Sequence, residues 1–179
     1  MTMNDFLELA AARQSCRDFA DQPVEHDKLV KCVEAARLAP SACNSQPWSF
    51  VVVEDPRVVP EVAKTSQVLG INEYISGARA FIVVLEEHAV LMPRLRALID
   101  SQYFAKSDLG GALLSLCLEA ESLGLGTCIL GLYNREKLCE LLDIPLEKQF
   151  AGLVAVGYPA KPGSREKIRK PLESIVRFV

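Results

Sequence analysis

DLGGALLSLCLEAESLGLG, residues 108–126, is the stretch of the sequence that decides the fold. Placed on a helix, its apolar side chains lie on nearly every side, which is typical of a helix that is buried all round. Gly124 or Gly126 should end this helix, because glycine readily adopts the backbone conformation that closes a helix C-terminus. We therefore predict that residues 108–126 form the core of the domain.

The chain on either side of this helix reads as short strands and amphipathic helices. Strands are expected where β-branched and aromatic residues run together between breakers, at 48–54, 81–86, 127–130 and 150–159. Helices are expected where apolar residues recur at helical spacing, at 4–13, 25–39, 60–69 and 134–144. Thr2 and Asp5 suit the start of the first helix, and Pro40 ends the second.

These elements alternate, but the connections between them lack the regularity of repeated strand–helix–strand units. The pattern favours an α+β class, with a central mixed sheet flanked by helices, over a doubly wound parallel sheet. The sequence contains no internal repeat and no linker-like tract. One domain covering residues 1–179 is therefore expected.

The composition points to a small-molecule partner. The formal net charge is −3 and the basic residues are scattered, which argues against nucleic acid and anionic lipid as partners. The N-terminal residues are acidic and amphipathic, unlike a secretory signal. The longest apolar stretch, Leu109–Leu118, is too short to cross a bilayer. These features predict a cytoplasmic protein that does not bind membranes.

The cysteines do not form a metal-binding pattern. They lie far apart with no CxxC pair, so neither a zinc site nor an iron–sulfur cluster has ligands at workable spacing, and no metal is expected. Reduced, mostly buried thiols are the better interpretation. The six residues are Cys16, Cys32, Cys43, Cys117, Cys128 and Cys139.

The first motif with chemical content is Arg13-x-Ser15-x-Arg17, at the end of the first expected helix. Two guanidinium groups and a hydroxyl within five residues suit a phosphate, because the arginine fork matches the geometry of its oxygens. The alternative is a solvated helix end with surface arginines. The motif alone does not decide between the two.

The second motif is the loop APSACNSQPW, residues 39–48, which is dense in small hydrogen-bonding side chains and has a proline near each end. Rigid loops of this kind bind the polar edges of flat heterocycles. The alternative is an ordinary turn between a helix and a strand, in which Trp48 is buried in the core.

Two further motifs lie towards the C-terminus. GLGTCILG, residues 124–131, follows a helix and precedes a strand, which is the reverse of the order in a dinucleotide fingerprint. Its glycines are expected to end the long helix and to let a cofactor ring approach the backbone near Leu130 and Gly131. Lys167-x-Arg169 places two cations on one side of an extended segment. The alternative for this pair is a solvated basic tail.

Taken together, RxSxR, PSxxNSQPW, the long helix ending in LGLGT, the GYP turn and the late KxR closely resemble the nitroreductase family of flavoproteins. The resemblance runs from about Leu7 to Ile175. It implies an FMN-dependent oxidoreductase that passes electrons from NAD(P)H to a small, flat acceptor, nitroaromatic or quinone-like. It further implies a homodimer with two FMN sites at the interface.

The resemblance also implies roles for individual residues. Arg13, Ser15 and Arg17 would bind the FMN phosphate and the pyrimidine side of the ring. Lys167 and Arg169 would complete the phosphate site. Positive charge at Arg17 would raise the reduction potential of the flavin, because the reduced ring accumulates negative charge at that edge.

A second group of residues would contact the ring itself. Pro40, Ser41 and Asn44 would reach the flavin of the opposite subunit, whereas Leu130 and Gly131 would lie along the ring in the same subunit. No catalytic side chain is implied, since the redox chemistry belongs to the flavin.

Several alternatives remain open at this point. The same pocket could store flavin without turnover, and the resemblance also covers relatives that dehalogenate, fragment flavin or dehydrogenate heterocycles. Cys43 replaces another small residue of the family loop, and the segment from Val58 to Tyr103, which sets the substrate in this family, is short. Tyr103 and Phe104 could stack on an acceptor or pack in the core. The only two histidines, His26 and His88, are expected on the surface away from all four motifs.

Overall fold

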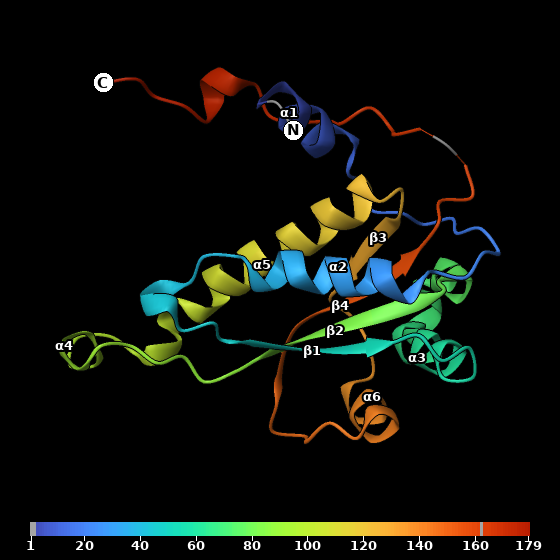
Figure 1. Cartoon of the computed structure of the whole chain (residues 1–179), viewed down its shortest axis with the longest axis horizontal. Coiled ribbons are helices and arrows are strands. Elements are labelled where there is room, and N and C mark those ends of the chain that lie inside the picture. Colours follow the sequence, from blue (N-terminus) through green and yellow to red (C-terminus); the bar gives the residue numbers. More distant parts are fainter. Residues whose placement is uncertain (1–2, 162) are drawn as a thin grey trace.

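The computed structural model describes residues 3–161 and 163–179. Its centre is a four-stranded sheet with strand order β1-β2-β4-β3, in which each strand runs antiparallel to its neighbours (Figure 1). The strands are β1 (Trp48–Val53), β2 (Ala80–Glu86), β3 (Gly126–Leu130) and β4 (Gln149–Gly157). The helices are α1 (Met3–Ala12), α2 (His26–Arg37), α3 (Val59–Ser66), α4 (Pro93–Arg96), α5 (Ala105–Ser122) and α6 (Arg135–Leu142).

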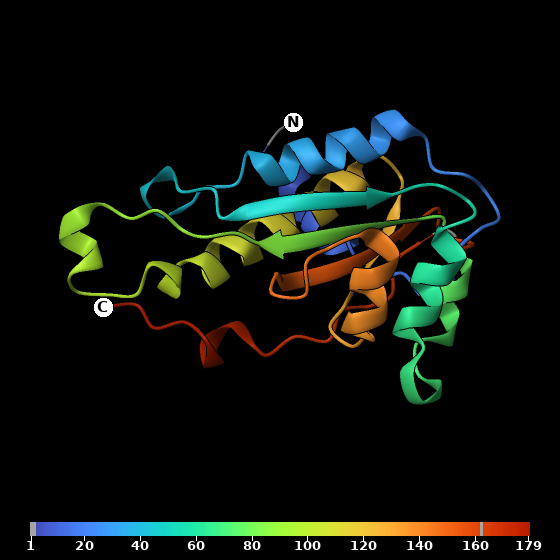
Figure 2. The same cartoon turned by 90° about the horizontal axis from the view of Figure 1, so that it is seen from below.

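Helices cover both faces of the sheet (Figure 2). Alternate side chains of β2 enter two separate apolar clusters, because successive residues of a strand point to opposite faces. Ala80, Ile82 and Val84 pack in the cluster that contains α2 and α5. The remaining β2 side chains in the core pack with α3 and α6 on the other face; they are Phe81, Val83 and Leu85. Burial on both faces explains why this strand is continuously apolar.

Helix α5 is a main element of the core, as its sequence predicts, but it is not buried all round. Leu109, Leu116 and Ala120 are buried, whereas Leu114 is 53% exposed. One side of α5 is therefore left uncovered by the part of the chain that the structure describes. The helix ends as expected: Gly124 has φ +76°, its N–H donates to Glu121 O at 3.0 Å, and the N–H of Leu125 donates to Ala120 O at 2.8 Å.

The α+β class is confirmed. The predicted strands and the helices from 25–39 onward are present, with ends that shift by a few residues. The sheet was expected to be mixed, but all the pairings between its four strands are antiparallel. Among the described residues, parallel pairing is found at one isolated bridge, between Ser15 and Thr127. Thr2, the expected start of the first helix, lies outside the described residues.

Two local features differ from the expectation. The helix predicted at 60–69 ends at Ser66, and Leu69 adopts a left-handed conformation with φ 56°. The short helix α4 was not predicted, because its four residues are too few to show a periodic pattern. Within the described part of the chain, none of the helices combines the length and apolar character that a membrane span requires.

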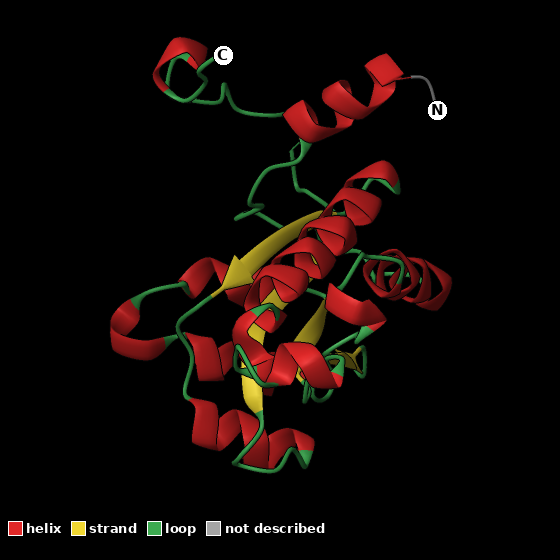
Figure 3. Cartoon of the chain, turned by 90° about the vertical axis from the view of Figure 1, so that its left-hand side faces the viewer, coloured by secondary structure: helices red, strands yellow, loops and turns green. Residues whose placement is uncertain are grey.

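Helix α1 and the C-terminal tail, residues 163–179, stand apart from the layered body of the molecule (Figures 1 and 3). The tail has no strand, and its only helical turn is Leu172–Ser174. Its apolar side chains are open to solvent; Ile168 is 92% exposed and Phe178 is 91% exposed.

Candidate functional site

The two cationic motifs from opposite ends of the chain line one pocket of about 490 Å³. Arg13, Ser15 and Arg17 follow α1, and Lys167 and Arg169 come from the tail. Arg13 and Lys167 are 154 positions apart in the sequence, yet Lys167 Nζ donates a hydrogen bond to the carbonyl oxygen of Arg13. The structure thus brings together all five residues that the sequence suggested for a phosphate.

The segment after α1 is attached to the edge of the sheet. Ser15 forms the parallel bridge to Thr127 of β3, and the N–H of Cys16 donates to Thr127 O at 2.8 Å. Gly126 is required for this close approach, because a Cβ at that position would lie 2.7 Å from Cys16 Cβ. The first half of the pocket is therefore positioned by β3.

The tail is attached to the same segment through Gln14. Its Nε2 donates to Gly163 O at 2.9 Å, and its Oε1 accepts a hydrogen bond from the N–H of Arg165 at 3.1 Å. The guanidinium of Arg165 also donates to Ser15 O at 3.1 Å. Arg165 lines the pocket with the predicted residues and adds a further cation to them.

The charges in the pocket fit a bound anion. The lining includes five cationic residues and one carboxylate, Glu166. Partial burial lowers the pKa of the Lys167 ammonium, and the neighbouring charges of Arg13 and Arg169 lower it further. Like charges held this close repel one another, and a phosphate between them would relieve the repulsion.

Arg17 points towards a residue that the sequence analysis did not identify. Its guanidinium lies over the ring of Tyr74, 5.8 Å from the centroid. The Tyr74 hydroxyl donates to Asn72 Oδ1 at 2.9 Å and lies 3.8 Å from Cys128 Sγ in β3. Burial raises the pKa of this hydroxyl further above neutral pH, where tyrosine is already a hydrogen-bond donor. Tyr74 therefore gives Arg17 a preferred direction next to β3.

The loop from Pro40 to Trp48 has a specific and strained conformation. Cys43, Asn44 and Gln46 have φ values of 54°, 51° and 49°. These values lie in the left-handed backbone region, which residues other than glycine rarely adopt. Ser41 Oγ accepts a hydrogen bond from the N–H of Gln46 at 2.9 Å. Strain of this kind persists only where the surroundings hold it, and it is concentrated at binding sites.

This loop does not join the cationic pocket within one chain. The N–H of Ala42 donates to Asp108 Oδ2 at 3.1 Å, next to the first turn of α5. The cationic pocket lies beside the last turn of the same helix. Burial there raises the pKa of Glu121, and the nearby charges of Arg13 and Lys167 partly offset this rise. Asp108 and Glu121 are thirteen positions apart on this α-helix, about 20 Å along its axis.

Leu130 and Gly131 lie at the far end of β3 from the cationic pocket. The five residues from Thr127 to Gly131 span about 13 Å. Leu130 is buried, so it can offer only its backbone to a ligand, and a Cβ on Gly131 would meet no atom within 4 Å. A ligand that is anchored among the cations and extends along β3 would reach open space beside Gly131.

The remaining candidates lie elsewhere. His26 is hydrogen-bonded to Glu54 at 2.9 Å, and His88 is exposed. Tyr103 and Phe104 form an edge-to-face pair, with centroids 5.0 Å apart, immediately before α5. They lie at the end of α5 that also holds the 40–48 loop. Five of the six cysteines are buried free thiols, as expected, and Cys43 is exposed.

Sequence reasoning missed Gln14, Tyr74 and Arg165. The signal for Arg165 was present in the basic run from Arg165 to Lys170, but position in the sequence alone does not show which cations converge. Gln14 and Tyr74 carry no local signal, because their contacts depend on how the tail and the turn after α3 fold back on β3.

Replacement of Lys167 or Arg169 by alanine should weaken FMN binding roughly ten- to a hundredfold, since each change removes one charge-assisted contact. The measurement is titration of the apoprotein with FMN. Lys170→Ala, an exposed lysine of the same tail outside the pocket lining, is the matched control and should leave the affinity unchanged. Equal FMN affinity in all three variants would show that the tail is a solvated segment and does not bind the phosphate.

The depressed pKa of Lys167 also predicts a pH dependence. The phosphate is attracted by the charged ammonium, and Lys167 loses its proton at a lower pH than an ordinary lysine. FMN affinity should therefore begin to fall below the usual lysine range as the pH rises, and this part of the decline should be absent in Lys167→Ala. Identical pH profiles in the two proteins would contradict the assignment.

Three comparisons show which known proteins this chain resembles. Residues 10–158 match the family model described as Nitroreductase family. The chain is 33% identical over 161 residues to an Archaeoglobus fulgidus protein named for NADH dehydrogenase and NAD(P)H nitroreductase activity, covering 88% of this chain and 87% of the relative. It is 30% identical over 186 residues to FMN reductase [NAD(P)H] of Bacillus subtilis, covering 97% and 73% of the two chains. A solved structure from Desulfovibrio desulfuricans in complex with FMN superposes with a TM-score of 0.75 at 27% identity, covering 98% and 96%.

Proposed function

Because this chain belongs to the nitroreductase family, we propose that it is an NAD(P)H-dependent FMN oxidoreductase whose acceptor is a small, flat molecule of the nitroaromatic or quinone type. The observation that carries the proposal is the pocket in which residues from both ends of the chain converge, five of them cationic. A single cluster of cations suits the one phosphate group of FMN.

Bound FMN would supply the redox chemistry, by accepting a hydride from NAD(P)H and passing electrons to the acceptor. The residues of this chain bind and orient it. Arg13, Lys167 and Arg169 would hold the phosphate, and Leu130 and Gly131 would offer their backbone to the ring. Arg17, directed by Tyr74, would place positive charge at the edge of the ring where negative charge increases on reduction.

The proposed active form is a homodimer with shared sites. Pro40, Ser41 and Asn44 lie at the opposite end of α5 from the cationic pocket, so a second copy is needed to bring such a loop to the same FMN. The exposed side of α5 at Leu114 and the exposed apolar side chains of the tail also favour a dimer. Monomeric proteins rarely leave such surface open, and a second copy would cover it.

The purified protein should be yellow, and the pigment released by denaturation should be FMN. Under anaerobic conditions NADH or NADPH should bleach the flavin, and a nitroaromatic or quinone should restore its colour. Flavin that is bound but not bleached would make the protein a carrier, and bleached flavin that neither acceptor reoxidises would refute the acceptor class. A colourless protein that takes up no added FMN would refute the proposal altogether.

A further inference from the structure

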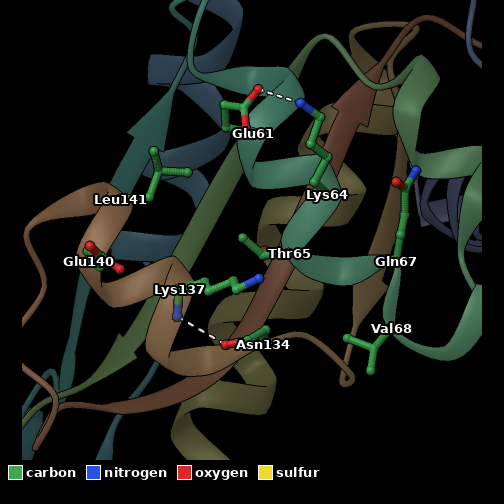
Figure 4. A pocket seen from close by; sticks show the side chains of 9 residues that line it. All are labelled: Glu61, Lys64, Thr65, Gln67, Val68, Asn134, Lys137, Glu140 and Leu141. Atoms are coloured by element: carbon green, nitrogen blue, oxygen red, sulfur yellow. Dashed lines mark hydrogen bonds and ion pairs between the residues drawn. The ribbon is translucent and has the colours of Figure 1, made fainter.

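A second pocket, of about 610 Å³, forms a groove between α3 and α6 (Figure 4). Its floor is held by a hydrogen bond from the N–H of Asn134 to Thr65 O at 2.6 Å, which ties the start of α6 to the end of α3. The groove is of the size that proteins use for small molecules and cofactors. It lies on the sheet face opposite α2 and α5.

One lining residue of the groove, Asn134, is close in sequence to the backbone proposed to contact the flavin ring. Asn134 follows Gly131 by three residues, which span at most about 10 Å. A chain of contacts leads from the cationic pocket to Ser66, which lies between the groove residues Thr65 and Gln67. Arg17 lies over Tyr74, Tyr74 donates to Asn72 Oδ1, and Asn72 Nδ2 donates to Ser66 O at 3.2 Å.

Two lysines from the facing helices line the groove. Lys137 of α6 extends towards Thr65 of α3, and Lys64 of α3 is 2.7 Å from Glu61 (Figure 4). The side chains of the Lys64–Glu61 pair are 66% and 51% exposed, so this ion pair is weak and Lys64 can exchange partners. Glu140 also lines the groove. Ammonium groups suit phosphate oxygens, and carboxylates accept hydrogen bonds from ribose hydroxyls.

We propose that this groove binds the adenosine diphosphate half of NAD(P)H, with Lys64 and Lys137 on its phosphates. The nicotinamide end would then leave the groove near Asn134 and reach the ring beside Gly131. The inference rests on the proposed function, since it assigns a place to the reductant that function requires.

The direct test uses ADP-ribose and its 2′-phosphorylated form, which carry no nicotinamide and cannot react. Calorimetric titration of the FMN-loaded protein should give an affinity about tenfold lower in the double variant Lys64→Ala/Lys137→Ala. The affinity of the natural protein should fall with added salt, and the double variant should lose most of that dependence. Which of the two ligands binds more tightly gives the NADH or NADPH preference.

Kinetics and controls make the test specific. The double variant should raise KM for NAD(P)H by a similar factor, with kcat and FMN content unchanged. Lys137→Arg should retain most of the affinity. Lys31→Ala, an exposed lysine of α2 on the opposite face, should change nothing.

Two outcomes would overturn the inference: equal ADP-ribose affinity in the double variant and the natural protein, or loss of FMN together with ADP-ribose, which would indicate a structural role. If the first occurs in a protein that still oxidises NAD(P)H, the proposed function stands and only the groove is wrong. If NAD(P)H never reduces the flavin, the proposed function fails, and ADP-ribose binding still decides whether the groove is a nucleotide site.

Discussion

Mixing Arg17→Ala chains with Asn44→Gly chains should restore flavin binding that each variant has lost alone. In the proposed dimer, one site of the mixed molecule collects both lesions and the other collects neither. With random exchange of subunits, about half of the dimers should be mixed and each should carry one intact site. Flavin content and NAD(P)H oxidation should therefore rise above both parents.

The choice of glycine at position 44 follows from the backbone. Asn44 has φ 51°, and glycine keeps this left-handed conformation without strain while it removes the side-chain amide. The matched control mixes Arg17→Ala with Lys167→Ala, whose lesions lie in the same pocket of one chain. Every site of that mixed dimer carries one lesion, so no rescue is expected.

The shared site is contradicted by verified subunit exchange without any rise in flavin content. It is equally contradicted by a folded monomer that binds FMN as tightly as the dimer. Analytical ultracentrifugation at the concentrations of the titration shows whether FMN binds to a monomer or to a dimer. A shared site requires FMN binding to follow the dimer equilibrium, because of mass action.

Gly126→Ala should damage both stability and flavin binding, although Gly126 is not in the lining of the cationic pocket. The added Cβ would lie 2.7 Å from Cys16 Cβ and 2.8 Å from Cys16 Sγ. Cys16 Cβ is fixed to its backbone, so the segment carrying Ser15 and Arg17 must move away from β3. We expect a loss of about 1–3 kcal/mol in the free energy of unfolding, as for other overpacked core positions. FMN affinity should fall more than about tenfold, because the phosphate ligands lose their fixed positions.

Gly152→Ala is the matched control, because it also lies in a buried strand of the sheet. Its Cβ would meet Ile129 Cγ2 at 3.4 Å and Leu113 Cδ2 at 3.5 Å, which are ordinary contacts with flexible side-chain ends. Chemical denaturation of the two apoproteins should show a larger loss of stability in Gly126→Ala, and FMN titration should show a larger loss of affinity. If Gly126→Ala matches Gly152→Ala in both measurements, the contact between the 15–17 segment and β3 does not position the site.

The sequence predicted most of the secondary structure correctly because the signals are local. Residues 25–39 repeat their apolar positions at helical spacing, and the helix is found at His26–Arg37. FIVVLE is apolar without alternation, and β2 is buried on both faces. The resemblance to the nitroreductase family, drawn from the order and spacing of the sequence motifs, is confirmed by the family match over residues 10–158.

The strained loop was only partly predictable. Its prolines and small polar residues indicated a rigid connection, but Cys43, Asn44 and Gln46 adopt left-handed conformations at positions without glycine. Their conformation depends on bonds to distant residues, such as Ala42 to Asp108 and Val90 to Ser45. Residue type in the loop alone does not encode those bonds.

By itself, the sequence determined which elements form, which motifs bear charge and which family the chain belongs to, because these depend on residue type and on neighbours a few positions apart. Only the tertiary structure decided that Gln14 and Arg165 join the predicted cations, that Tyr74 directs Arg17, and that the 40–48 loop lies at the opposite end of α5 from the cationic pocket. The reason is physical: the strand order β1-β2-β4-β3 and the burial of both sheet faces set which distant segments meet. That choice is made by the packing of the whole chain and not by any single stretch of it.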